Sequence, residues 1–266
     1  MSETGSAGAR DIARVFVDAR RDGRGLTSYP GAAPVTMADA YAIQDAAIAM
    51  HGDRVAGWKI GKINPPFSDT LGANRLAGPI FAGSIVTQAS GGTAMPVFAD
   101  GFAAAEAEFL LRIGAAPDPA KSDYTIAEAT ALIDAVHAGI EIASSPYPGI
   151  NADGPAVTAS DFGNNNGLVV GEAVEGWRVI DINAWQLEML INGAVIGTGC
   201  GRDMLDGPFG AAAFLFNLAA KRGFALAPGQ WISSGAVTGV HPVAIGDTIE
   251  ARFDGGLPVR CTITTS

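Results

Sequence analysis

Hydrophobic residues recur at helical spacing in two segments near the start of the chain. They fall every three or four positions over residues 9–21 and again over residues 37–50, a period typical of an amphipathic helix. The second segment follows Thr36, a residue type that caps helix N-termini, and it stops before Gly52. The pattern therefore predicts two helices in this part of the chain.

Strand-like patterns take over from residue 54. The run 54–62 is rich in apolar residues and breaks at Asn64-Pro65-Pro66. Helical patterns return only near residues 125–137 and 209–221. Short apolar runs separated by Gly and Pro clusters predict further strands over residues 105–113, 139–143, 167–170, 185–191, 194–198, 230–233, 248–253 and 259–264.

The order of these elements lacks the regular alternation of strand and helix that a doubly wound parallel sheet requires. We therefore expect an α+β fold, in which a mixed β-roll or barrel-like sheet carries peripheral helices. We expect a small helix-rich N-terminal subdomain over residues 1–85 and a β-roll catalytic domain over residues 86–266.

Charge and composition narrow the classes of partner. The 27 acidic and 17 basic residues give a formal net charge of −10, which repels nucleic acid and anionic membrane surfaces. The two cysteines, Cys200 and Cys261, form neither a CxxC motif nor a disulfide framework. The N-terminal segment carries charges throughout, unlike a signal peptide, and no run is apolar enough to span a membrane. We expect a soluble cytoplasmic protein.

Three glutamates stand in apolar surroundings. Glu106 and Glu108 lie two positions apart within the run 101–114, so a strand there directs both to the same face. Glu141 is the only charged residue of the run 138–143. Burial of three like charges requires a neutralising cation, and Mg²⁺ and Mn²⁺ prefer oxygen ligands. The pattern indicates a divalent-metal site.

The alternative interpretation places these glutamates on solvent-facing strand surfaces. Residues 103, 105, 107 and 109 make a complete apolar opposite face, which is typical of a half-buried strand. Ala104 and Leu110, however, extend the glutamate face with apolar residues, which disfavours solvent exposure. Glu141 has its own alternative, an exposed position on an edge strand.

Lys59 shares its predicted strand face with Gly57 and Gly61, which leave room for a ligand beside the ammonium. A lysine near a metal-bound keto acid can pair with its carboxylate or relay a proton. The alternative is an ordinary surface lysine, which is our interpretation of Lys62.

Two glycine-rich turns, 198–209 and 232–239, offer backbone N–H groups and hydroxyls to a carboxylate, although such turns are usually only turns. The three histidines, His51, His137 and His241, show no ligand spacing and are interpreted as structural or surface residues.

Several short motifs, taken in order, resemble the fumarylacetoacetate hydrolase superfamily. The chain is most similar there to the group of 2-hydroxypenta-2,4-dienoate (2-keto-4-pentenoate) hydratases and 4-oxalocrotonate decarboxylases, over nearly its whole length. The motifs are Trp58-Lys-Ile-Gly61, Gly78-Pro-Ile-Phe81, Ala105-Glu-Ala-Glu-Phe109, Gly139-Ile-Glu-Ile142 and Ile232-Ser-Ser-Gly-Ala236.

The resemblance implies a mixed β-roll fold that binds a Mg²⁺ or Mn²⁺ ion. It also implies that the 2-keto oxygen and the carboxylate of the substrate chelate this ion, which stabilises an enolate. It implies that Ser234 and Gly235 approach the substrate and that Asp161 is a support residue near the site. The resemblance also implies that Glu106, Glu108 and Glu141 are the metal ligands and that Lys59 is the catalytic lysine.

One departure concerns the run Arg75-Leu-Ala-Gly78. The hydratases and decarboxylases of the group usually carry an acidic residue just before this glycine, and no carboxylate stands there in this chain. If that acid delivers water or a proton, another residue substitutes for it or the reaction differs.

The main hypothesis is a metal-dependent lyase that adds water to a 2-keto-4-enoate or 2-hydroxydienoate, with Lys59 as proton shuttle. Alternatives are decarboxylation of a 2-oxo-dienedioate and C–C hydrolysis of an acylpyruvate. The last needs a water-activating base, commonly a histidine with a carboxylate partner. A non-enzymatic alternative is a small-molecule-binding or assembly subunit. The resemblance also implies a homo-oligomer, a dimer or a larger ring of dimers, and most soluble oligomers have such closed symmetry.

Overall fold

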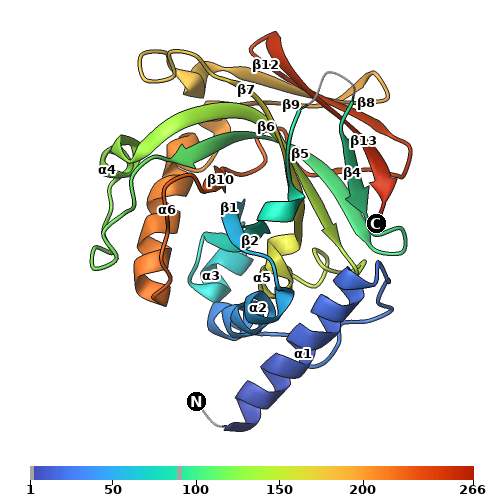
Figure 1. Ribbon diagram of the computed structural model, residues 1–266. Helices are drawn as coiled ribbons and strands as arrows, with labels where there is room; N and C mark the ends of the chain where they lie inside the picture. Colours follow the sequence, from blue (N-terminus) through green and yellow to red (C-terminus); the bar gives the residue numbers. More distant parts are fainter. Residues whose placement is uncertain (1–2, 89–91) are drawn as a thin grey trace.

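A computed structural model describes residues 3–88 and 92–266. The fold is mixed α+β, as expected, and it is built around a strongly curled sheet (Figure 1). A smaller sheet covers one face of the curled sheet (Figure 1). Most of the helices lie on the other side of the curled sheet and beyond its ends (Figure 1). This is the β-roll architecture predicted from the sequence.

The helices follow the local signals of the sequence. Thr36 caps α2 by accepting a hydrogen bond from the Asp39 N–H (3.1 Å), and Gly52 ends it with a φ of 85°. Thr125 and Glu128 form a reciprocal capping box at α4. The helices are α1 (Glu3–Arg21), α2 (Met37–His51), α3 (Phe67–Leu71), α4 (Ile126–Ala131), α5 (Pro155–Ser160) and α6 (Gly207–Arg222).

The helix expected over residues 125–137 is wrong in its second half. It ends at Ala131, and Ile133 already begins a long strand. Residues 133–145 pair along their whole length with β5, and this tertiary pairing overrides the local helical spacing. The other expected strands are present, several of them longer than their sequence patterns.

The strands are β1 (Val55–Lys62), β2 (Arg75–Phe81), β3 (Ile85–Thr87), β4 (Ala94–Val97), β5 (Phe102–Ile113), β6 (Ile133–Ser145), β7 (Asn165–Ala173), β8 (Gln186–Ile191), β9 (Ala194–Cys200), β10 (Trp231–Ser233), β11 (His241–Pro242), β12 (Thr248–Phe253) and β13 (Gly256–Thr265).

The curled sheet has eight strands in the order β2-β1-β10-β5-β6-β7-β3, with β11 paired to β5. The smaller sheet has five strands in the order β4-β13-β12-β8-β9. Strands β1 and β2, from the N-terminal part, thus belong to the same sheet as β5 and β6. The division of the chain at residue 85 stays a prediction.

The main core lies between the two sheets. Ala105, Ala107 and Phe109 of β5 belong to a buried cluster with Met189 of β8 and Phe253 of β12. Full burial of an aromatic side chain such as Phe109 contributes on the order of 2 kcal/mol. Because side chains alternate along a strand, the even-numbered residues of β5 face the opposite, concave side of the curled sheet.

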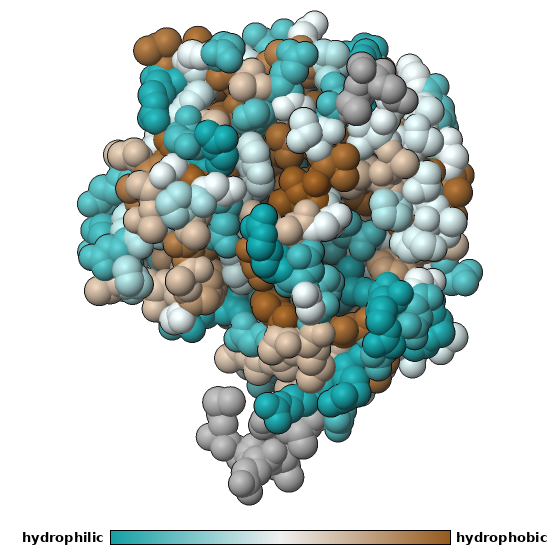
Figure 2. Space-filling model, viewed as in Figure 1, coloured by the Kyte–Doolittle hydropathy of each residue, from teal (hydrophilic) through white to brown (hydrophobic). Residues whose placement is uncertain are grey.

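Surface hydropathy is mixed on the face shown in Figure 2. Hydrophobic residues gather near the middle of the view, and hydrophilic residues dominate the rim. None of the described helices has the length and apolar character needed to cross a bilayer.

Candidate active site

The three glutamates meet on the concave face of the curled sheet. Glu106 and Glu141 are direct cross-strand partners in the β5–β6 ladder, and Glu108 is two residues farther along β5. One carboxylate oxygen from each residue lies within 4.8 Å of the others, and all three side chains are buried. The structure thus brings together the three residues that the sequence suggested as metal ligands and places none of them on a solvent-facing surface.

The hydrogen bonds of these carboxylates leave part of their capacity unused. Glu108 Oε2 accepts from the Ser233 hydroxyl and from the Gly235 N–H (2.9 Å). Glu141 Oε1 accepts from the Asn165 side-chain amide at 2.8 Å. Glu108 Oε1 and Glu141 Oε2 have no hydrogen-bond partner among the described residues. Buried oxygens without a donor are costly, and a cation satisfies them directly.

Electrostatics within the cluster point in the same direction. Burial raises the pKa of Glu106 to about 7, against the opposing effect of Lys59. Burial, followed by repulsion from Glu141 and Glu106, raises the pKa of Glu108 well above its ordinary value. Protein groups alone therefore do not hold all three carboxylates ionised at neutral pH. The donor set consists of hard oxygen atoms, which fit Mg²⁺ or Mn²⁺.

Lys59 reaches this cluster from β1. It lies beside Ser233 in the β1–β10 register and is 4% exposed. Its Nζ is 3.4 Å from Glu141 Oε1 and donates a hydrogen bond to Asn164 Oδ1 at 3.2 Å. Burial opposes the ammonium, but Glu141, Glu106 and Glu108 together raise the pKa of Lys59 above its ordinary value. The surface-lysine alternative is therefore wrong for this residue.

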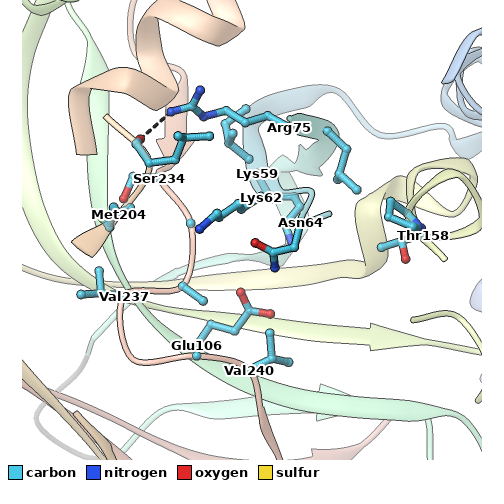
Figure 3. A pocket seen from close by; sticks show the side chains of 18 of the residues that line it. Lys59, Lys62, Asn64, Arg75, Glu106, Thr158, Met204, Ser234, Val237 and Val240 are labelled. Carbon is cyan, nitrogen blue, oxygen red and sulfur yellow. Dashed lines mark hydrogen bonds between the residues drawn. The ribbon is translucent and has the colours of Figure 1, made fainter. Parts of the chain in front are cut away.

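A pocket of about 460 Å³ opens over Lys59 and Glu106. Figure 3 shows Glu106 and Arg75 on opposite sides of it, and Lys59 and Lys62 lie between them. Its charged lining residues are Lys59, Lys62, Arg75, Glu106 and Asp203. Lys62, interpreted from sequence as an ordinary surface lysine, thus lines the pocket together with Lys59.

Ser234 and Gly235 also line the pocket, as the resemblance implied. The Ser234 hydroxyl oxygen is buried and has no hydrogen-bond partner in the described part of the chain. Gly235 adopts a φ of 112° and donates its N–H to Glu108, so the turn presents the hydroxyl while it anchors a glutamate.

Asp161 does not belong to this pocket. Its two carboxylate oxygens bind the guanidinium of Arg20 at 2.7 and 2.8 Å, and the Ser145 hydroxyl donates to it at 2.6 Å. Asp161 therefore contacts neither the pocket nor the glutamates directly, and its role as a support residue stays a prediction.

Sequence reasoning missed several residues that contact the site. Asn164 and Asn165 bind Lys59 and Glu141, and Ser233 binds Glu108. The three consecutive asparagines 164–166 were a visible signal, because a polar run ahead of an apolar strand is unusual in a buried segment. The histidines take no part in the glutamate cluster, in agreement with their interpretation from sequence.

Comparisons with known proteins agree with this geometry. A segment of 130 residues is 31% identical to the 4-oxalocrotonate decarboxylase of Pseudomonas sp. (strain CF600) and covers 49% of each chain. A match of 218 residues is 28% identical to the 2-keto-4-pentenoate hydratase of Burkholderia vietnamiensis (strain G4 / LMG 22486) and covers 80% of each. The chain is thus similar in sequence to a decarboxylase and to a hydratase of the kinds that its motifs resemble. No protein-family model matches it.

The similarity in fold to a solved decarboxylase structure extends over almost the entire chain. The 4-oxalocrotonate decarboxylase from Pseudomonas putida G7, complexed with calcium and acetate, superposes with a TM-score of 0.79 and 22% identity over 97% of both chains. A structure of that decarboxylase with magnesium and adipate gives the same TM-score. In sequence, however, the chain spans only about half the length of the curated decarboxylase that it matches.

Proposed function

We propose that this protein is a divalent-metal-dependent lyase that acts on a small 2-oxo acid. One observation carries the proposal: three buried glutamates converge beside a buried lysine at a pocket, and two of their oxygens have no donor among the described residues. The relatives named hydratase and decarboxylase, and the neighbour complexed with calcium or magnesium, support the same chemistry.

Glu106, Glu108 and Glu141 would hold Mg²⁺ or Mn²⁺. A cation bound there supplies Lewis-acid polarisation of a 2-oxo group, which stabilises negative charge on the neighbouring carbon and oxygen atoms. Ser233 and Gly235 hold the Glu108 carboxylate, and Asn165 holds that of Glu141. Such hydrogen bonds orient metal ligands and typically contribute about 10–100-fold to metal affinity.

Lys59 is the proton-transfer group of the proposal. Its Nζ carries a proton at neutral pH because the carboxylates raise its pKa. Neutralisation of those carboxylates lowers this pKa toward the range in which the lysine exchanges protons with a substrate carbon. Asn164 fixes the ammonium by accepting one of its hydrogen bonds. The unpartnered Ser234 hydroxyl is positioned to bind the substrate carboxylate.

The first specific reaction that we propose is addition of water to a 2-keto-4-enoate or 2-hydroxydienoate. The hydratase relative, matched over 80% of its length, supports this choice. C–C hydrolysis of an acylpyruvate receives less support, because no histidine is among the residues that line the pocket in the described part of the chain.

Decarboxylation of a 2-oxo-dienedioate is the second candidate, and the basic residues of the pocket favour it. Lys62 and Arg75 are cross-strand partners in the β1–β2 register, and both line the pocket. Arg75 pairs with the half-exposed Asp206, whereas Lys62 has no ion-pair or hydrogen-bond partner among the described residues. Asp203 adds one negative charge to the lining. The free ammonium of Lys62 suits a second carboxylate, and decarboxylation requires no water-activating base.

Turnover of the purified protein tests the proposal directly. We expect turnover of 2-hydroxypentadienoate or 2-oxohexenedioate with Mg²⁺ or Mn²⁺, complete loss with a chelator, and recovery on metal addition. Glu108→Gln should be inactive under all conditions, since it removes one ligand charge. Turnover of these substrates or of acylpyruvates that is unaffected by chelation contradicts the proposal.

A further inference from the structure

Three consecutive residues adopt left-handed backbone conformations at the end of α5. Phe162, Gly163 and Asn164 have φ values of 57°, 62° and 59°. For residues other than glycine this conformation costs roughly 1 kcal/mol each, so surrounding contacts must hold the turn in place. The turn delivers Asn164 to Lys59 Nζ and Asn165 to Glu141 Oε1, both within hydrogen-bond distance.

Arg20, from the C-terminal turn of α1, makes several hydrogen bonds to the residues that flank this turn. Its guanidinium binds both carboxylate oxygens of Asp161, the residue directly before the turn, at 2.7 and 2.8 Å. It also donates to the main-chain oxygen of Asn165 and to the Asn166 side chain, each at 3.2 Å. Arg20 thus binds residues on both sides of the left-handed turn.

The rest of the surroundings fit the turn closely. The Ser145 hydroxyl donates to Asp161 at 2.6 Å. A Cβ atom at Gly78 of β2 would lie 2.0 Å from the Phe162 carbonyl oxygen, so β2 approaches the turn backbone as closely as only glycine permits. The Phe162 side chain is 1% exposed in a second core cluster with residues of α1 and α2.

Stability alone does not account for the ion pair. The side chains are 8% and 0% exposed, and a buried pair of this kind is often no more stabilising than apolar residues of similar volume. An apolar pair, however, has no donors for the main-chain oxygen of Asn165. The planar guanidinium binds a carboxylate and two further acceptors in a fixed geometry.

We propose that Arg20 is a positioning residue for the active site, which acts through the Asp161-to-Asn166 turn. Through Asn165 it sets the orientation of the Glu141 carboxylate, and through Asn164 it sets the position of the Lys59 ammonium. Helix α1 then helps to position the metal ligands, in addition to packing against the rest of the fold. The inference rests on the proposed metal site for its readout.

The test is a double-mutant cycle on Mn²⁺ affinity, measured by titration calorimetry on the full chain. Arg20→Lys keeps the charge but loses the two-pronged geometry, and we expect about 10-fold weaker Mn²⁺ binding, the lower end of the effect of such supporting contacts. Asn165→Ala should weaken binding by a similar factor. The double variant should be no weaker than the weaker single variant, because both changes remove the same support.

Arg21→Lys is the matched control. Arg21 is the next residue of α1, its side chain is 66% exposed, and its ion-pair partners among the described residues are Asp18 and Asp22. The Mn²⁺ affinity of the Arg21→Lys variant should therefore equal that of the wild type. If Arg20→Lys does not fold, the paired change Arg20→Met with Asp161→Leu replaces it, because it removes the ion pair without leaving a buried charge unpaired; Mn²⁺ binding should weaken in the same direction.

Each outcome decides one question. A wild-type protein that binds no Mn²⁺ contradicts the proposed function itself. Wild-type binding with unchanged affinity in Arg20→Lys, or in the paired change Arg20→Met with Asp161→Leu when that replaces it, overturns the positioning role alone. Fully additive losses in the cycle also overturn it, because Arg20 then acts independently of Asn165.

Discussion

Removal of divalent cations should make the stability of the protein fall as the pH rises. In the metal-free protein the pKa of Glu106 is raised from 4.5 to about 7 by burial. The folded state therefore binds a proton at this group that the unfolded state has already released. Between these two pKa values the free energy of unfolding decreases with pH. The penalty is absent below about pH 4.5 and complete above about pH 7.

The magnitude follows from the shift. A difference of about 2.5 pKa units corresponds to about 3.5 kcal/mol in total, at about 1.4 kcal/mol per unit. Glu108, whose pKa is also raised, adds to the effect in the same direction. The lowered pKa of His51, caused mainly by burial, acts in the opposite direction near pH 6 and is shared by any variant at residue 106.

The assay is urea denaturation from about pH 5 to about pH 8, with a chelator or with Mg²⁺ in excess. The chelated wild type should lose about 2.5 kcal/mol across this range relative to Glu106→Gln, which cannot ionise, because the rest of the effect falls below pH 5. Excess Mg²⁺ should remove the loss by binding the ionised carboxylates. A chelated wild type whose pH dependence matches that of Glu106→Gln would refute the reasoning, since Glu106 would then titrate alike in both states.

Three further predictions concern turnover, specificity and assembly. Lys59→Met should retain Mn²⁺ affinity yet lose about 10²–10⁴-fold in kcat, as expected for a general acid–base group; near-normal turnover would make the lysine structural. Lys62→Met should weaken competitive inhibition by dicarboxylic 2-oxo acids more than by matched monocarboxylic ones, whereas the exposed Lys221→Met should affect neither; equal weakening would remove Lys62 from specificity. Sedimentation at micromolar concentration should show a homo-oligomer, and a 27.1 kDa monomer alone would contradict this.

Local patterns predicted much of the fold and the center of the site. The two-residue alternation along β5 was sufficient to put Glu106 and Glu108 on one face, and the apolar residues Ala104 and Leu110 on that same face disfavoured solvent exposure. Glu106 and Glu141 were assigned to one site because both are carboxylates in apolar strand-like runs. The β5–β6 register is what places them side by side. That register also explains why residues 133–137 form a strand against their helical spacing.

Other parts of the site depend on contacts that leave no periodic signal. Arg20 and Asp161 are separated by 141 residues along the chain. In sequence, an arginine at the end of an amphipathic helix that binds a buried carboxylate cannot be distinguished from one that is exposed to solvent. Asp161 was singled out because its segment resembles one near the site in the fumarylacetoacetate hydrolase superfamily, but the side chains of this segment that contact the site are those of Asn164 and Asn165. Which polar side chain points inward is decided by the left-handed turn, and that turn depends on contacts with α1 and β2.

Direct titration of Mn²⁺ into metal-free wild-type protein and into Glu108→Gln, with and without pyruvate, tests the central claim most directly. The wild type should bind one ion per chain, and pyruvate should bind only when the ion is present, because its 2-oxo and carboxylate oxygens share the cation with the glutamates. Glu108→Gln should bind neither with comparable affinity. Equal Mn²⁺ binding by both proteins, or pyruvate binding without the ion, would contradict a metal-dependent site for 2-oxo acids at these three glutamates.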